Sequence, residues 1–340
     1  SVSRDSATGR VGTGRDGFDR GDVQDRRGDP DSVGRRRLQT GDRSTPATRK
    51  GRSHSMRYES PTTTKEAAKL LAKAKGEAFV LAGGTDLLVR MKGGFIEPEL
   101  VVDIKRIPAT QQITKNNGAF KIGAGVPCAA LAENAALVKA WPGVVEAANL
   151  IGSDQIQGRC TVAGNLCNAS PAADSVPAMV AAKAKASVVG PKGRRTVAVE
   201  KIVTGPGSLS LAKGEVVESI TLPKRPSKSG DAYLRFIPRT EMDIAVCSAG
   251  VSLTLGAKGV VKEARVALGA VAPTVVLVPA AAKAIVGTKL DDDALAKMAK
   301  ACEKACNPID DKRGTIEFRT EVAGVLARRA AAIAYKRAGG

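Results

Sequence analysis

The sequence predicts a mixed fold of helices and strands whose turns are built on glycine. From Met56 onward, short apolar segments of strand length alternate with segments whose apolar residues recur at helical spacing. Hydrophobic residues make up 43% of the 340 residues, which is enough for a substantial core. Gly-Gly pairs and Pro-containing segments separate the elements. This length and pattern suit two or three modest subdomains.

The first half of the regular region alternates helices and strands with short connections. Thr85 or Asp86 is expected to cap the second helix, and Gly93-Gly94 to end it. The expected elements are helices at 65–75, 87–92, 128–137, 144–150 and 176–184, and strands at 78–82, 100–104 and 120–122.

The last third of the chain groups its strands before its helices. A Pro/Ser/Lys linker at 224–230 precedes three expected strands, with a glycine-flanked hairpin turn at 256–259. The strands are expected at 233–237, 245–255 and 260–268, and the helices at 278–286, 293–306 and 316–336.

Charge and composition exclude several classes of protein. The chain carries 53 Lys and Arg against 34 Asp and Glu, a net charge of +19, and its single histidine is His54. A Ser-His-Asp triad, a His-rich zinc site and histidine acid–base catalysis are therefore not expected in the folded part. Aromatic residues are 3% of the chain, too few for the stacking platforms of nucleic-acid-binding surfaces. No run of 18 apolar residues occurs, so no membrane span is expected.

Residues 1–55 differ from the rest in composition. They contain 13 basic and 8 acidic residues and few apolar ones, too few to offset the entropy of ordering. We interpret them as a disordered basic extension upstream of the start at Met56. An Arg-rich nucleic-acid arm and a targeting segment are the alternatives, but the interspersed Asp residues and the missing apolar region count against them.

Two segments of small residues are the candidate binding sites. The first, residues 80–87, joins a strand to a helix through Gly83-Gly84, so its backbone N–H groups can approach a phosphate closely. The second, residues 161–174, is a long segment composed mainly of small and polar residues. It is either a tight packing loop with Asp174 as a helix cap, or a second phosphate loop whose Asp174 accepts hydrogen bonds from ligand hydroxyls. Neither G-x-G-x-x-G nor G-x-x-x-x-G-K-[ST] occurs.

The six cysteines form no C-x-x-C unit. Cys302 and Cys306 are four residues apart on an expected helix, which does not make a cluster site by itself. We interpret the cysteines as small buried hydrophobes in a reducing cytosol, and we expect no metal on this chain.

Taken together, these motifs resemble the FAD-binding subunit of the molybdenum hydroxylases, the family of xanthine dehydrogenase, carbon monoxide dehydrogenase and 4-hydroxybenzoyl-CoA reductase. The resemblance covers nearly all of residues 56–338. The matching blocks occur in the family's order, at residues 81–88, 151–156, 161–174, 219–223, 239–245 and 313–319.

The resemblance implies an α+β architecture. A two-subdomain FAD-binding fold of the vanillyl-alcohol-oxidase (PCMH) type would occupy residues 56–223, divided at about residue 112. A C-terminal domain with an antiparallel sheet and helices would occupy residues 224–340.

The resemblance also implies the residues that contact FAD. The family's first pyrophosphate loop matches Val80, Leu81, Ala82, Gly83, Gly84, Thr85, Asp86 and Leu87, and its second matches Thr161, Val162, Ala163, Gly164 and Asn165. The carboxylate that binds the ribityl–pyrophosphate region matches Asp174, and the residue beside the flavin ring matches Ile151. Arg239 and Asp243 match a block near the ring. An ordinary ion pair is the alternative for the last two.

Two positions depart from the family pattern. Ala163-Gly164 stands where many members have Gly-Gly, and Val246 stands where xanthine dehydrogenases often have Lys. The second departure puts NAD in doubt as the electron acceptor.

The function implied is electron relay in a cytoplasmic complex. This chain would hold FAD and have no catalytic side chain of its own, while partner subunits carry the molybdenum cofactor and [2Fe-2S] clusters. The partners would be a small iron–sulfur subunit and a large molybdenum subunit, assembled as a dimer of heterotrimers. NAD, a quinone or a carrier protein would take the electrons. Two alternatives are a self-sufficient flavoenzyme of the same fold, such as the UDP-N-acetylenolpyruvoylglucosamine reductases, and a basic nucleic-acid-binding protein suggested by charge alone.

Overall fold

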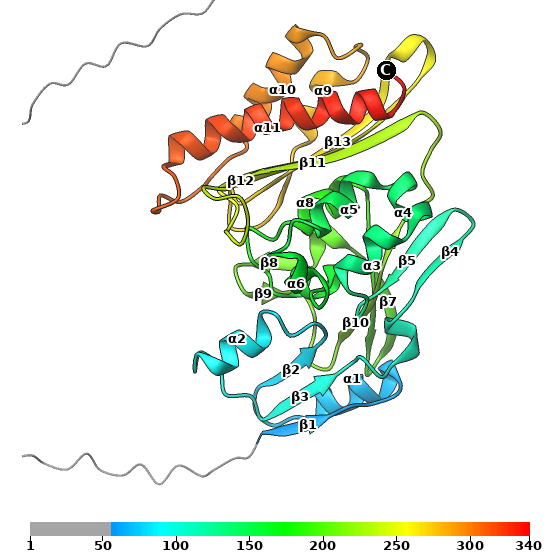
Figure 1. Cartoon of the computed structure of the whole chain (residues 1–340), viewed down its shortest axis with the longest axis vertical. Coiled ribbons are helices and arrows are strands. Elements are labelled where there is room, and N and C mark those ends of the chain that lie inside the picture. Colours follow the sequence, from blue (N-terminus) through cyan, green and yellow to red (C-terminus); the bar gives the residue numbers. More distant parts are fainter. Residues whose placement is uncertain (1–55) are drawn as a thin grey trace, which may run out of the picture. The chain divides into compact units, whose positions relative to one another are not determined.

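The computed structural model describes residues 56–340, in which three β-sheets follow one another along the chain with helices packed against them (Figure 1). The extension expected at residues 1–55 lies outside the described residues. The α+β architecture predicted from the sequence is confirmed.

The first sheet is parallel and has the strand order β1-β3-β2. Its central strand is fully buried, as expected of a strand that is covered on both faces. The elements are β1 (Arg57–Glu59), α1 (Thr64–Lys73), β2 (Ala78–Leu81), α2 (Leu87–Lys92) and β3 (Leu100–Asp103). The short strand β1 was not predicted.

The first helix begins at the N-cap residue Thr63, whose capping hydrogen bond explains why the helix starts one residue before the predicted position. The Thr63 hydroxyl accepts a hydrogen bond from the Glu66 N–H (3.2 Å), and the Glu66 carboxylate accepts one from the Thr62 N–H (3.3 Å). Its buried face, with Ala67, Ala68 and Leu71, packs between the first sheet and the second.

The second sheet is antiparallel, with the order β4-β5-β10-β6-β7. Its strands are β4 (Ile113–Asn116), β5 (Ala119–Gly123), β6 (Lys185–Gly190), β7 (Gly193–Ala198) and β10 (Val216–Leu222), and a separate hairpin joins β8 (Val203–Gly205) to β9 (Ser208–Leu209). Of these strands, the sequence predicted only β5.

Six short helices accompany the second sheet. They are α3 (Cys128–Glu133), α4 (Ala135–Ala140), α5 (Pro142–Ala148), α6 (Asp154–Gln157), α7 (Val162–Cys167) and α8 (Ser175–Ala181). The single helix predicted at 128–137 is wrong, because Asn134 leaves the helical conformation and its side chain accepts a hydrogen bond from the Leu137 N–H (3.0 Å), starting a new helix.

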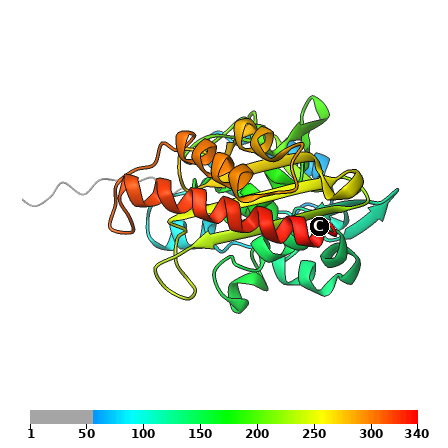
Figure 2. The ribbon, with the colours of Figure 1, turned by 90° about the horizontal axis from the view of Figure 1, so that it is seen from above.

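The third sheet is antiparallel in the order β11-β12-β13-β14, and its long strands are the ones predicted. Figure 2 shows α11 lying along this sheet, with α9 and α10 beside it. The elements are β11 (Ser229–Phe236), β12 (Cys247–Leu255), β13 (Val261–Gly269), β14 (Val276–Leu277), α9 (Pro279–Ile285), α10 (Asp292–Lys304) and α11 (Ile316–Arg337).

The linker before the third sheet is shorter than the residues 224–230 predicted for it, because β11 already begins at Ser229. No helix in residues 56–340 is both long enough and apolar enough to cross a membrane.

Candidate functional site

The first glycine loop leaves β2 and enters α2 through a left-handed glycine. Gly84 has φ +80°, which a residue with a side chain rarely adopts. Asp86 is the N-cap residue of α2, one of the two predicted positions, but its carboxylate makes no capping hydrogen bond. Instead, Asp86 Oδ1 accepts a hydrogen bond from Asn168 Nδ2 (3.1 Å).

The second glycine segment is partly helical rather than an open loop. Helix α7 occupies its first part, and the Thr161 hydroxyl caps this helix by accepting a hydrogen bond from the Gly164 N–H (2.9 Å). Asn165 has a structural partner, because its Oδ1 accepts hydrogen bonds from the Ser175 N–H (3.2 Å) and hydroxyl (2.7 Å) at the start of α8. Side-chain capping thus fixes the backbone of the whole segment.

The two glycine segments are in direct contact at Gly83. A Cβ atom added at Gly83 would lie 2.0 Å from the Arg159 carbonyl oxygen and 2.9 Å from the Cys160 Cα. Arg159 and Cys160 directly precede the second segment, so only glycine allows the two backbones to approach this closely. This contact, together with the Asn168–Asp86 hydrogen bond, joins two segments about 80 residues apart in sequence.

Backbone N–H groups in both segments lack partners. Within the described part of the chain, residues 83–86 donate no backbone hydrogen bond, and neither do Thr161, Val162 and Ala163. The last three residues are at most 3% exposed. Buried N–H groups are almost always paired in proteins, and this applies to Thr161, Val162 and Ala163, whereas residues 83–85 are half-buried and Asp86 is exposed. All of these N–H groups lie at or next to the starts of α2 and α7, where they have no partner within the helix and can donate to a ligand with several acceptor oxygens. A diphosphate is such a ligand.

Asp174 is held in a buried network that the sequence did not reveal. Its Oδ1 accepts a hydrogen bond from the Tyr233 hydroxyl (3.0 Å), and its Oδ2 forms an ion pair with Arg235 Nη1 (2.8 Å). Burial raises the pKa of Asp174, while Arg235 and Tyr233 act in the opposite direction. Asp174 stands at the N-cap position of α8, as the structural alternative expected, but its side chain makes no capping hydrogen bond. Tyr233 and Arg235 are two residues apart on β11, a spacing that places them on one face.

The block at residues 239–243 forms an ion pair at the end of the third sheet. Arg239 Nε lies 3.2 Å from Asp243 Oδ2, and Arg313 Nε lies 3.7 Å from Asp243 Oδ1. A hydrogen bond from the Ile244 N–H is the main cause of the lowered pKa of Asp243, and Arg239 adds to it. Among residues 56–340, no hydrogen bond or ion pair joins this block to the two glycine segments.

Ile151 follows α5 and is half-buried against the central core. Its backbone N–H donates to the Ala148 carbonyl (3.3 Å), and the next residue, Gly152, has φ +63°. Within residues 56–340, no hydrogen bond joins Ile151 to either glycine segment, and its predicted place beside a flavin ring stays a prediction.

These features define a class of protein: an α+β fold with two adjoining glycine segments whose backbone N–H groups are free to donate to a ligand. Comparisons with known proteins agree with this class. Residues 54–225 match the family described as the FAD binding domain in molybdopterin dehydrogenase, and residues 232–334 match the CO dehydrogenase flavoprotein C-terminal domain.

Individual relatives are similar over nearly their whole length. The chain is 34% identical to the carbon monoxide dehydrogenase medium chain of Afipia carboxidovorans over 281 residues, which are 83% of this chain and 97% of that protein. It is 28% identical to the xanthine dehydrogenase FAD-binding subunit of Escherichia coli, over 83% of this chain and 97% of that subunit. A solved structure of CO dehydrogenase from Oligotropha carboxidovorans superposes with a TM-score of 0.80 at 34% identity, covering 83% of this chain and 98% of the matched chain.

The chain therefore belongs to the family of FAD-binding flavoprotein subunits of the molybdenum hydroxylases, as its sequence motifs predicted. The unpaired N–H groups of the two glycine segments fit FAD, whose diphosphate offers the acceptors that these groups lack. The match also shows that the chain is a subunit of an oxidoreductase.

Proposed function

We propose that this chain relays electrons through FAD between iron–sulfur clusters on a partner subunit and an external acceptor. The similarity to flavoprotein subunits of molybdenum hydroxylases carries the proposal, and the contact of Gly83 with Arg159 supports it by placing the two glycine segments side by side. Family membership supports FAD as the ligand that these groups bind.

We assign the chain's own residues to binding and positioning. The N–H groups of residues 83–86 and 161–163 would hold the diphosphate, and Asp174 would accept a hydrogen bond from a ribityl hydroxyl. Because Arg235 and Tyr233 fix both of its oxygens, Asp174 would present a rigid acceptor. Ile151, Arg239 and Asp243 would lie near the ring. FAD supplies two-electron redox chemistry that can be delivered one electron at a time.

The proposed assembly follows from the relatives, which are named medium chains or FAD-binding subunits. A small iron–sulfur subunit and a large molybdenum subunit would complete a heterotrimer in the cytoplasm, and two heterotrimers would pair. NAD, a quinone or a carrier protein would accept the electrons. We divide this chain at about residue 223 into an FAD-binding domain and a C-terminal domain.

Co-expression with the neighbouring subunits tests this function. The relay predicts that the chain copurifies with molybdenum- and iron–sulfur-containing subunits, and that the substrate of the complex bleaches the flavin band only when the iron–sulfur subunit is present. Turnover of a dedicated substrate by the isolated, FAD-loaded chain would instead support a self-sufficient flavoenzyme and contradict the relay.

A further inference from the structure

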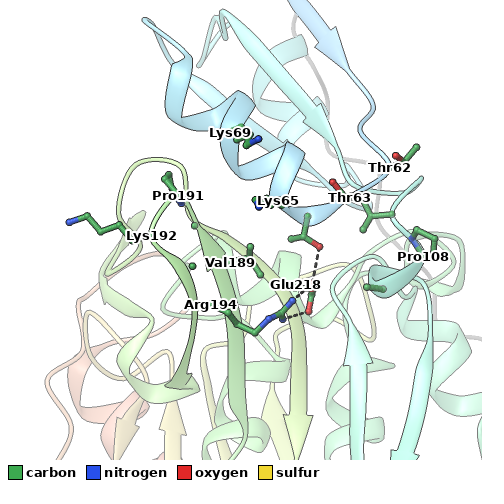
Figure 3. A pocket seen from close by; sticks show the side chains of 15 residues that line it. Thr62, Thr63, Lys65, Lys69, Pro108, Val189, Pro191, Lys192, Arg194 and Glu218 are labelled. Atoms are coloured by element: carbon green, nitrogen blue, oxygen red, sulfur yellow. Dashed lines mark hydrogen bonds and ion pairs between the residues drawn. The ribbon is translucent and has the colours of Figure 1, made fainter.

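A second candidate site lies in a cleft of about 800 Å³ between α1 and the β6–β7 hairpin. Figure 3 shows Lys65 and Lys69 on the helix, and Lys192 and Arg194 on the hairpin. The volume lies within the usual range for small-molecule sites. None of the residues that line this cleft is among the predicted FAD contacts, so the argument is independent of the proposed function.

One buried acid in the cleft is fully neutralised. Glu218 is 3% exposed; its Oε1 accepts hydrogen bonds from the Thr64 hydroxyl (2.8 Å) and Arg194 Nη2 (2.8 Å), and its Oε2 pairs with Lys121 (3.5 Å) and Arg194 Nη1. These contacts lower the pKa of Glu218 to about 2, chiefly through the Arg194 hydrogen bonds. The network also ties α1 to β10 and β7, so the walls of the cleft are held in place.

The other cations of the cleft have no such partner. Within residues 56–340, no acidic group lies within 4.0 Å of Lys65, Lys69 or Lys192. All three lysines are exposed, so water and salt screen their charges. Lys65 and Lys69 are four residues apart on α1, a spacing at which both ammonium groups can reach one anion.

The rest of the lining is largely apolar. The exposed apolar surface comes from Pro108, Ala109 and Pro191, while Ile107 and Val189 lie behind it and are almost fully buried. A bare inorganic ion would leave this surface wet, whereas an organic group attached to phosphates would cover it. We propose that this cleft binds an organic polyphosphate of nucleotide size, with the phosphates on the α1 lysines and the organic part against the apolar wall.

The test measures binding of ATP, without divalent metal, to the full chain saturated with FAD, by calorimetry in about 0.1 M salt. We expect one ATP per chain. Adenosine should not bind, and inorganic pyrophosphate should bind at least several-fold more weakly than ATP. The variant Lys65→Ser/Lys69→Ser should weaken ATP binding about tenfold.

A matched control removes the same charge at the C-terminal end of α1, from the last residue of the helix and from the residue after its C-cap. Lys73→Ser/Lys75→Ser alters exposed lysines outside the cleft and should change the affinity by less than about twofold. Both variants should keep wild-type FAD content. Absence of ATP binding, equal weakening by the two double variants, or pyrophosphate binding as tight as ATP would each overturn the proposal, whatever the FAD content.

Discussion

Replacing Gly83 by alanine tests the contact on which the FAD site depends. The added methyl group would lie 2.0 Å from the Arg159 carbonyl oxygen, where ordinary contacts begin at 3.4 Å. The two glycine segments must therefore part by roughly 1 Å, since both contacting atoms belong to backbone. A hydrogen bond of about 2.9 Å that lengthens by 1 Å is effectively lost.

The expected loss of affinity follows from the number of hydrogen bonds that break. Each bond to a charged phosphate contributes about 1.5–3 kcal/mol, so losing one or two costs about 3 kcal/mol. This corresponds to an FAD dissociation constant raised about 100-fold. Calorimetric titration of the apoprotein with FAD measures it, alongside thermal unfolding of the same samples.

Gly158→Ala is the matched control, because the nearest atom to its added Cβ is at 3.5 Å and its φ is not positive. It should change the FAD dissociation constant by less than about threefold. A Gly83→Ala protein that folds and binds FAD as tightly as wild type would refute the close contact of the two segments.

Three further changes test other parts of the account. Glu218→Gln should lower the free energy of unfolding by about 3 kcal/mol at pH 7, because the pKa of Glu218 is lower in the folded than in the unfolded protein. The wild type should lose this extra stability as the pH falls from about 4.5 to about 2. Urea unfolding across this range should therefore show a steeper acid dependence for the wild type than for the variant. Asp174→Asn leaves the buried Arg235 unpaired and should cost about 3–5 kcal/mol. The double variant Asp174→Asn/Arg235→Met should recover most of this stability in denaturant titrations but not FAD affinity; recovery of both would mean that the pair is purely structural. Arg319 donates hydrogen bonds to the Val246 carbonyl and to Asp311, and this buried fork holds the chain just before β12. Arg319→Lys removes the fork, so limited proteolysis should cut residues 237–246 faster; unchanged cleavage would contradict that role.

Local sequence signals predicted the elements whose pattern is strong. Helix α2 and the long strands β12 and β13 lie within two residues of their predicted positions, because apolar periodicity and flanking glycines define them. Strand β1 was missed because Arg57-Tyr58-Glu59 has no apolar alternation and is a strand only through pairing with β3.

The candidate site was predictable in its backbone but not in its side-chain partners. Glycine and small residues marked both segments, and Gly83 does mediate the close approach that such residues permit. The partners of Asp174 are Tyr233 and Arg235 on β11 of the third sheet. They lie 59 and 61 residues away in the sequence, and only the tertiary fold brings them to Asp174. Asn168 was within a recognised motif, yet nothing local indicated that its amide would reach Asp86.

The most direct test of the central claim is the absorption spectrum of the purified full chain. The account predicts a flavin band, with one FAD per chain released by denaturation and restored by adding FAD to the apoprotein. A colourless protein that folds but cannot be reconstituted with FAD would contradict it.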